Sequence, residues 1–380
     1  MRLKQVAIGM CLCAAAMTAS AQSFALLAHL NAETGGAPRN ALIQASDQNL
    51  YGTCAGGLKA VGPGTIFQVT TGGSFTVLHV FQTTDGSGPF GGLVEGSDGY
   101  LYGTTFAGGA NNYGTIFKIT TTGSLTTLYN FNVADGANPF TSLLLANDGN
   151  FYGTTKAGGA SGAGTIFRVT PSGTVTTLHS FSSKDGANPI GALIQATDLK
   201  LYGTTPAGGA NGLGTIFAIA LGGDFKTLHG FAGLDGDTPD DGLVQASDGN
   251  LYGTTVYGGA NNYGSIFRIS TVGVLTTVYS FDKGGPNPVG GLIHATDGNF
   301  YGTSTNGGTD GYGTIFSLTP AGTLTRLHSF TVAEGAYPLG TLLQGADGNL
   351  YGTTNGRGDS RLGSVFSLSL GLPPPAVGRK

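Results

Sequence analysis

The chain has 380 residues and a formal net charge of −4, and only 10% of its residues are charged, against about a quarter in ordinary domains. Its 69 glycines and 15 prolines stay just below the share at which disorder becomes the default, and 40% hydrophobic residues suffice for a core. An acidic chain without Lys and Arg clusters argues against nucleic acid and anionic membranes as partners.

The N-terminal segment has the pattern of a cleaved secretory signal peptide. Arg2 and Lys4 precede an apolar run, and Ala19-Ser20-Ala21 supplies the small residues of a cleavage site. The alternative, a transmembrane anchor, requires about 20 apolar residues, and the run offers about a dozen. We therefore expect a secreted or cell-surface protein whose mature chain begins at Gln22 and contains no transmembrane segment.

From Leu50 onward the chain repeats one sequence pattern. Consecutive copies are separated by 49 to 51 residues, and such regularity indicates a repeat architecture. The seven copies begin at Leu50, Leu101, Phe151, Leu201, Leu251, Phe300 and Leu350.

Each repeat has the pattern of four short β-strands. Apolar runs rich in Val, Ile, Thr, Tyr and Phe alternate with clusters of Gly, Asn and Asp, and no segment keeps a helical period. Tight turns, at Asp98-Gly99 and around Gly123, join the first strand to the second and the third to the fourth. The other connections are longer and emerge at the same end of an up-and-down sheet, so we expect one functional face of long loops. In the second repeat the expected strands are Gly92–Gly96, Tyr100–Thr104, Thr115–Thr120 and Ser124–Phe131.

Four antiparallel strands per repeat predict an all-β fold, a seven-bladed β-propeller with blades of about 50 residues. The stretch from Ser23 to Asn31 has the pattern of a lone fourth strand, and Gly363 to Leu370 that of a third strand without a fourth. Their pairing would close the ring and remove an exposed sheet edge. The alternative, a β-solenoid, needs end caps that neither terminus supplies.

The expected domains are the signal peptide at 1–21, the propeller at 22–370 and a proline-rich tail at 371–380.

Two aromatic positions recur in every repeat, and we interpret both as packing between blades instead of ligand stacking. The tyrosines are Tyr51, Tyr102, Tyr152, Tyr202, Tyr252, Tyr301 and Tyr351. The phenylalanines are Phe67, Phe117, Phe167, Phe217, Phe267, Phe316 and Phe366.

The segment DGNLYGTT, complete at Asp248–Thr255 and Asp347–Thr354 and followed in the repeat by GG and GTIF, resembles the GloVer (Gloeobacter/Verrucomicrobia-type) tandem repeat of bacterial exported proteins. The resemblance extends over about Ser23 to Leu370. It is more distantly similar to the blades of two-component sensor ectodomains and streptogramin lyase-like proteins, which usually have Trp where this chain has Tyr. The resemblance implies a secreted or surface repeat protein of bacteria and brings no catalytic residues with it.

One position of the innermost strand is polar in six of the seven repeats and predicts a polar collar near the central channel. Gln and His side chains with one carboxylate could bind a sugar or simply hold channel water. The candidate binding residues are Gln44, Glu95, Gln195, Gln245, His294 and Gln344, and Leu145 takes the seventh place.

One loop is unusually acidic. In LDGDTPDDG, four carboxylates repel one another unless a cation neutralises them, and Ca²⁺ prefers several oxygen ligands. The loop is therefore a candidate calcium site, with a solvated acidic loop as the alternative, and no other cofactor is expected. Its aspartates are Asp235, Asp237, Asp240 and Asp241.

The last long loop, NGRGDSRLG, is the most basic spot of the predicted long-loop face, so Arg357 and Arg361 are candidate binding residues. Cys54, the one cysteine of the mature chain, is expected to be a packed substitution for threonine. Two recurring sets are expected to be structural: His79, His179, His229 and His328 in the outer strand, and Asp85, Asp135, Asp185 and Asp235 in the turns that follow it.

The chain contains no GxSxG, HExxH or GKS/GKT motif. We therefore hypothesise a monomeric, non-enzymatic module that binds an extracellular glycan or protein through its long-loop face. One alternative is a hydrolase or lyase that acts on polysaccharide or a cyclic ester around the channel, using Glu95, His294 and the acidic loop. A purely structural surface array is the third hypothesis.

Overall fold

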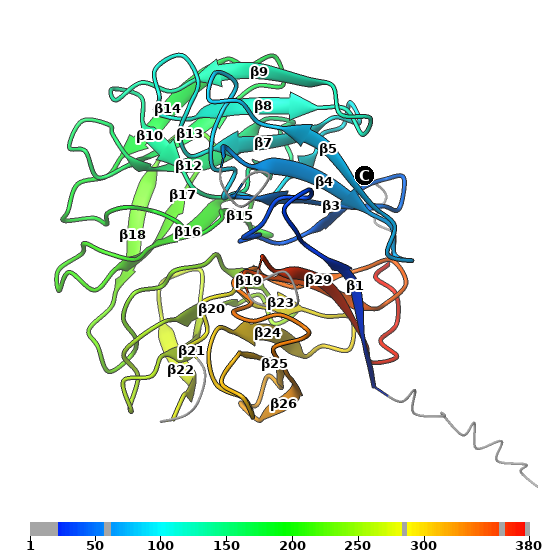
Figure 1. Cartoon of the computed structure of the whole chain (residues 1–380). Helices are drawn as coiled ribbons and strands as arrows, with labels where there is room; N and C mark the ends of the chain where they lie inside the picture. The colour runs from blue at the N-terminus through cyan, green and yellow to red at the C-terminus, as the bar shows by residue number, and fades with distance from the viewer. Residues whose placement is uncertain (1–21, 57–61, 283–286, 357–361, 377–380) are drawn as a thin grey trace, which may run out of the picture.

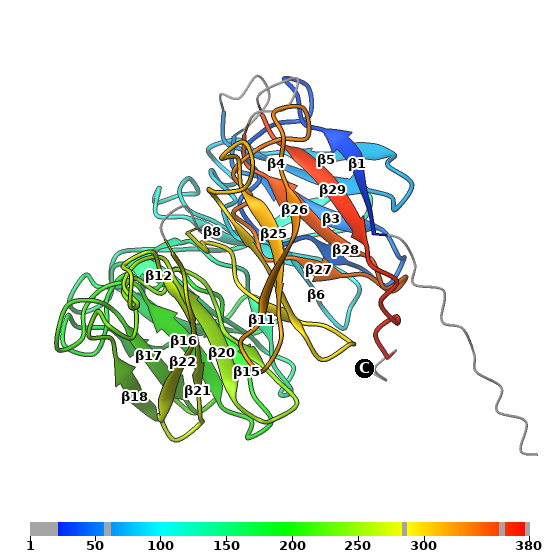
Figure 2. The same cartoon turned by 90° about the horizontal axis from the view of Figure 1, so that it is seen from below.

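The computed structural model describes residues 22–56, 62–282, 287–356 and 362–376. Within these ranges the secondary structure consists of β-strands, grouped in seven antiparallel sheets that stand in a ring as the blades of a propeller (Figures 1 and 2). The predicted seven-bladed propeller is therefore confirmed. The described part of the chain includes no helix that is long and apolar enough to cross a membrane.

The chain enters each blade at the strand nearest the channel and then runs outward. The innermost strands are β2 (Ile43–Gln44), β6 (Val94–Glu95), β11 (Leu144–Leu145), β15 (Ile194–Gln195), β19 (Val244–Gln245), β23 (Ile293–His294) and β27 (Leu343–Gln344). The second strands are β3 (Leu50–Cys54), β7 (Leu101–Thr105), β12 (Phe151–Ala157), β16 (Leu201–Thr205), β20 (Leu251–Thr255), β24 (Phe300–Ser304) and β28 (Leu350–Thr354).

The third strands are β4 (Thr65–Val69), β8 (Thr115–Ile119), β13 (Thr165–Val169), β17 (Thr215–Ile219), β21 (Ser265–Ile269), β25 (Thr314–Leu318) and β29 (Ser364–Ser369). The outermost strands are β5 (Phe75–Val80), β9 (Leu125–Asn130), β14 (Val175–Ser180), β18 (Phe225–Gly230), β22 (Leu275–Ser280), β26 (Leu324–Ser329) and β1 (Ser23–His29). An additional short strand, β10 (Ala137–Pro139), pairs with the end of β12.

The predicted strands of the second repeat agree with β7, β8 and β9 to within one residue at each end, whereas the innermost strand is shorter than predicted. Only Val94 and Glu95 of the expected Gly92–Gly96 pair with β7. The amide of Gly92 instead donates a hydrogen bond to Oγ of Ser142 in the next blade, at 2.9 Å. The beginning of the innermost strand therefore faces the channel and the neighbouring blade instead of its own sheet.

The ring is closed by pairing the two ends of the propeller. β1, the first strand of the chain, lies antiparallel to β29, the last, with Ser23 opposite Ser369 and Leu26 opposite Phe366 (Figure 1). The closed sheet has the order β1-β29-β28-β27, as predicted for a blade shared by both ends. This closure covers the edge of β29, which would otherwise present unpaired amides and carbonyls to other chains.

The recurring aromatics fill the interfaces between neighbouring blades, as predicted. Tyr152 of one blade and Phe217 of the next share one buried cluster, and Tyr202 and Phe267 share the following one. All four side chains are fully buried. The blades are therefore held together by packing.

The DGNLYGTT segment folds into a hydrogen-bonded turn that anchors each tyrosine. The Tyr51 hydroxyl donates to Oδ2 of Asp47 at 2.6 Å, while the amide of Asn49 donates to Oδ1 at 3.0 Å. Burial and the bond to Asp47 raise the pKa of Tyr51 to about 12. Burial alone would raise the pKa of Asp47, but its hydrogen bonds lower it overall. The same tyrosine-to-aspartate bond recurs in all seven blades, at 2.6 to 3.0 Å.

The glycine of LYGTT is required because the phenylalanine of GTIF lies against it. Gly203 is paired with Phe217, and a Cβ atom at Gly203 would lie 2.6 Å from Cζ of that ring. We expect Gly203→Ala to lower the free energy of unfolding by about 1–3 kcal/mol, the usual cost of overpacking a core. Chemical denaturation measures this loss. Gly222→Ala is the matched control because a Cβ there meets nothing within 4 Å, and equal effects of the two substitutions would contradict the packing argument.

Candidate functional site

The two long loops of each repeat lie on one face and are bonded to each other. In the second repeat the amide of Ser87 donates to the carbonyl of Ala107 at 2.7 Å, and the amide of Ala107 donates back to Ser87 at 2.9 Å. Ser87 precedes the innermost strand and Ala107 follows the second strand, so the bridge joins the two kinds of loop. The expected long-loop face therefore exists, and its loops support one another.

A residue with a left-handed backbone conformation, followed by a proline, directs the side chain after the proline into the mouth of the channel. Asn138 has φ 59°, and its side-chain amide donates to the carbonyl of Phe106 at 2.9 Å. The Pro139 ring packs against Gly114, and a Cβ atom at this position would lie 2.8 Å from Cδ of the ring. The φ of +96° at Gly114 also favours glycine. The chain is thereby held on both sides where Phe140 enters the channel.

The residues that follow this proline form a ring of seven, one from each blade, which we call the mouth ring. All seven line one cavity of about 270 Å³, together with Asn40 and Asp241. The mouth ring consists of Arg39, Phe90, Phe140, Ile190, Asp240, Val289 and Leu339. Five of these side chains are apolar and two are charged, so the cavity has the composition of a small-molecule site.

One side of the mouth is aromatic. The Phe90 and Phe140 rings lie 5.0 Å apart, and Phe106 packs at 5.2 Å from Phe90 and 6.1 Å from Phe140. The Arg39 guanidinium lies 5.2 Å from the Phe90 ring centre, and the Lys156 ammonium lies 5.6 Å from that of Phe140. These contacts place a cation at each end of the aromatic wall.

The acidic side of the mouth contains two adjacent carboxylates. Burial and the neighbouring charge of Asp241 raise the pKa of Asp240 to about 6, although the Lys156 ammonium acts in the opposite direction. Burial also raises the pKa of Asp241, against the effect of its hydrogen bonds. The protonation state of Asp240 therefore changes near pH 6. Side chains with a pKa shifted in this way are more frequent at functional sites than elsewhere.

Below the mouth, Asp241 links three blades. Its Oδ2 accepts hydrogen bonds from the amide of Gly291 at 2.6 Å and the hydroxyl of Thr341 at 2.9 Å, and its Oδ1 accepts from the amide of Gly242 at 2.6 Å. A second cavity of about 200 Å³ at this level is lined by Asp241, Thr341 and Ser142 among others. Asp241 is thus engaged by the fold, whereas Asp240 faces the upper cavity.

The acidic loop does not gather its four aspartates. Asp235 accepts hydrogen bonds from the amide of Ala232 and pairs with His229, so it caps the turn beside the outer strand. Asp237 accepts a bond from Thr238, and only Asp240 and Asp241 line the channel. Within the described ranges no three His, Cys, Asp or Glu side chains are grouped to hold a metal ion. Calcium binding by this loop stays a prediction.

The predicted polar collar forms at the opposite end of the channel, where the short turns lie. The amide of Ser46 donates to Glu95 at 3.0 Å, and the amide of Thr197 donates to Oε1 of Gln245 at 2.8 Å. His294 instead lies 5.1 Å from the Phe300 ring. Gln44, Gln195 and Gln344 likewise accept a bond from the preceding blade. The glutamines and Glu95 of the collar therefore connect blades, whereas the ring contact of His294 is within its own blade, and ligand binding by the collar stays a prediction.

The collar and the acidic loop do not meet. Glu95, Gln44 and Gln344 line a cavity of about 520 Å³ at the short-turn end, together with Pro375 and Ala376. Asp240 lines the separate cavity at the mouth. The enzyme hypothesis based on Glu95, His294 and the acidic loop therefore lacks a common site.

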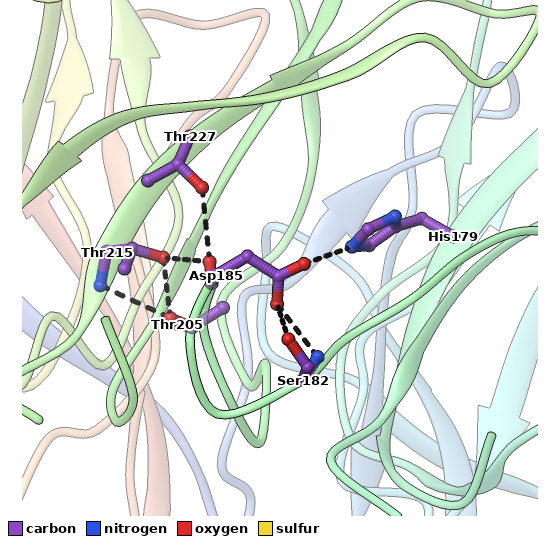
Figure 3. Close-up of polar contacts among 6 residues, drawn as sticks. All are labelled: His179, Ser182, Asp185, Thr205, Thr215 and Thr227. Carbon is purple, nitrogen blue, oxygen red and sulfur yellow. Dashed lines mark hydrogen bonds and ion pairs between the residues drawn. The ribbon is translucent and has the colours of Figure 1, made fainter. Parts of the chain in front are cut away.

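The outer-strand histidines are structural, as predicted. His179 Nε2 lies 3.1 Å from Oδ2 of Asp185, whose Oδ1 accepts a hydrogen bond from the amide of Ser182 (Figure 3). The carbonyl of Asp185 accepts a bond from Thr215, whose hydroxyl also contacts Thr205 at 2.8 Å (Figure 3). Burial lowers the pKa of His179 despite the nearby carboxylate. Equivalent contacts join His79 to Asp85, His229 to Asp235 and His328 to Glu334.

Two further predicted features have different outcomes. Cys54 is fully buried, and burial raises the pKa of its thiol to about 12, which supports its interpretation as a packed residue. Arg357 and Arg361 lie outside the described residues, as does the predicted signal peptide at 1–21.

Sequence reasoning missed the mouth ring. The position after the loop proline differs in nearly every repeat, while the residues around it recur, so a search for positions that vary between otherwise similar repeats would have found it. Lys156 lies near the end of β12 and was also missed, because only the fold brings it to the Phe140 ring.

The Gloeobacter/Verrucomicrobia repeat model matches three overlapping segments of the chain, residues 14–148, 134–294 and 282–372. A search of the curated proteins found no match.

Several solved structures share the fold at low sequence identity. The extracellular domain of a protein from B. thetaiotaomicron, classed as a hybrid two-component system, is 13% identical with a TM-score of 0.63. The match covers 92% of this chain, which spans only 40% of that structure. Two proteins classed as 6-phosphogluconolactonases, from Bacteroides uniformis and Bacteroides fragilis, are 16% and 17% identical with TM-scores of 0.55 and 0.53. They match 80% and 81% of this chain and 87% and 88% of their own. At these identities the likeness shows the propeller fold alone.

Proposed function

Because the chain belongs to the Gloeobacter/Verrucomicrobia repeat family and begins with the pattern of a signal peptide, we propose that it is an exported, non-enzymatic module that binds a glycan at the long-loop mouth of its channel. The observation that carries the proposal is the aromatic wall of the mouth cavity. Phe90 and Phe140 are half-buried and line a cavity of about 270 Å³. A cavity of this volume suits a small ligand better than it suits the surface of a protein partner.

The two sides of the cavity match the two kinds of surface on a sugar ring. The C–H face of a pyranose is apolar and can lie on Phe90 and Phe140, while its hydroxyl groups are donors and acceptors at the ring edge. Asp240 and Asn40 line the same cavity and offer polar partners for those hydroxyls. A protein partner would instead need a broad contact, of which this recess would be a small part.

We expect the double substitution Phe90→Ala and Phe140→Ala to weaken glycan binding at least tenfold, because each ring loses its contact area with the sugar. Isothermal titration calorimetry of residues 22–380 against neutral and acidic oligosaccharides measures the affinity. Leu234→Ala is the matched control, since Leu234 is 82% exposed and is not among the residues that line the cavity. Unchanged affinity in the double variant, with an unchanged melting temperature, would contradict the proposed site.

A second candidate function, a hydrolase or lyase that acts on polysaccharide or a cyclic ester, is favoured by Asp240. A carboxyl group with a pKa of about 6 beside a second carboxylate suits general acid or base chemistry near neutral pH. Incubation of the protein with each bound glycan, followed by chromatography of the products, decides between the two functions. Product formation that Asp240→Asn abolishes would establish the enzyme, whereas intact glycan after long incubation supports the binding module.

A further inference from the structure

We propose that the mouth selects a sugar that carries an anionic group, a carboxylate or a sulfate, which Arg39 and Lys156 bind at the two ends of the Phe90–Phe140 wall. This inference rests on the proposed function, since it names the class of glycan that the same site accepts. It adds a charge requirement that an aromatic wall by itself would not impose.

The first observation is the order of the groups along the wall. Arg39, Phe90, Phe140 and Lys156 form a row in which the guanidinium lies 5.2 Å from the first ring, the rings lie 5.0 Å apart, and the ammonium lies 5.6 Å from the second ring. A cation that contacts a ring face still has N–H donors directed elsewhere. A sugar on the wall would therefore lie between two sets of donors.

The second observation is that neither cation forms a direct ion pair with a carboxylate of the fold, although the Lys156 ammonium acts on Asp240 from a distance. Within the described ranges, the ion pairs join four outer-strand histidines to carboxylates and Lys200 to Asp198, and none includes Arg39 or Lys156. Charged residues make up only 10% of this chain, and two of its cations lie against the rings of this one aromatic wall. An anionic group on the ligand would supply a direct ion-pair partner, and the Arg39 guanidinium can bind it through two parallel hydrogen bonds.

The third observation is that Asp240 faces the same cavity and restricts the orientation of the ligand. Its carboxylate repels an anion, so the anionic group must lie toward Arg39 and Lys156, while a hydroxyl faces Asp240. The charged groups around Asp240 are Asp241, which disfavours its ionisation, and Lys156, which favours it, and Arg39 lines the same cavity. As the pH falls through about 6, Asp240 loses its charge, so affinity for an anionic sugar should rise.

The test compares ligands that differ only in charge. Titration calorimetry of residues 22–380 uses oligogalacturonate and its methyl ester as the carboxylate pair, and dextran sulfate and dextran as the sulfate pair. We expect the anionic member of at least one pair to bind about tenfold or more tightly than its neutral partner, and the pair that shows this identifies the anionic group. Arg39→Gln and Lys156→Gln should each remove most of that difference. Lys226→Gln, on the exposed side of β18, makes the same charge change away from the mouth and should not.

Asp240→Asn supplies an independent readout. The wild-type protein should bind the anionic sugar more tightly at pH 5.5 than at pH 7.5, and this difference should disappear in the variant, because the titrating group is gone. Equal affinity for both members of each pair would overturn the charge requirement and leave the proposed glycan site intact. If neither the neutral nor the anionic ligands bind, the proposed function fails as well. If Lys226→Gln weakens binding of the anionic ligand as much as Arg39→Gln and Lys156→Gln do, the effect comes from overall charge and the inference is overturned.

Discussion

Removal of β1 is expected to open the ring and to leave a protein that unfolds well below the temperature of the intact chain and aggregates. β1 pairs with β29 over Ser23–His29, and Phe24 stacks on Phe366 at 5.5 Å and on His328 at 4.1 Å. Loss of the half-buried side chains and ladder bonds of this strand should cost on the order of 5 kcal/mol, a large part of the stability of a typical domain. The exposed edge of β29 then becomes a template for pairing between chains.

Circular dichroism melting and size-exclusion chromatography of residues 31–380 measure both effects. The matched control removes residues 374–380, a deletion of comparable length whose described residues lie outside every sheet. A synthetic peptide of residues 22–30 should restore the melting temperature if strand pairing is the cause. A truncated chain that stays monomeric and melts like residues 22–380 would contradict the role assigned to β1.

The protein is also expected to resist alkali to above pH 10 and then to unfold cooperatively by about pH 12. In the unfolded chain tyrosine ionises near its ordinary pKa of 10, whereas the folded chain keeps the recurring tyrosines protonated to higher pH. Stability from these groups is therefore complete below pH 10 and is lost as the pH rises through about 12. Burial, with the bond to the neighbouring aspartate, raises the pKa to about 12 in Tyr51, Tyr152 and Tyr351 and raises it above 10 in Tyr102, Tyr202, Tyr252 and Tyr301.

Phenolate absorbance and circular dichroism, followed together from pH 8 to pH 13, measure this transition. The rise in absorbance from the buried tyrosines should coincide with loss of the strand signal, since ionisation requires exposure. Tyr202→Phe should remove one ionising group and also lower stability at neutral pH, because Asp198 loses the hydroxyl that donates to it at 2.7 Å. Complete tyrosine ionisation near pH 10 with the strand signal intact would refute the argument.

The fold was predictable because it depends on local patterns that recur seven times. Asp47, Asn49 and Tyr51 contact one another within five residues, so the turn and the start of β3 follow from the sequence alone. The four-strand order of a blade requires only short connections, and the unmatched strands at the two ends indicated ring closure before their pairing was seen. The histidines of the outer strands were also predictable as structural, because the same slot recurs beside the same acidic turn.

The candidate site was less predictable because its residues come from different blades. The sequence indicated that the long loops share a face, but it placed the candidate ligands at the collar and across the whole acidic loop. The structure uses Glu95 and Gln245 to connect blades and directs Asp235 to a turn. Of the acidic loop, Asp240 and Asp241 reach the channel mouth.

Sequence by itself therefore determined the repeat, the blade, the number of blades and the closure of the ring, since each arises from contacts within one repeat or between neighbouring repeats of similar sequence. Only the tertiary structure decided which side chains share a cavity. Arg39 and Asp240 are about 200 residues apart in the chain and meet because the ring brings blades one and five around one channel. The pKa of Asp240 likewise depends on burial and on Lys156 from another blade, neither of which a single repeat contains.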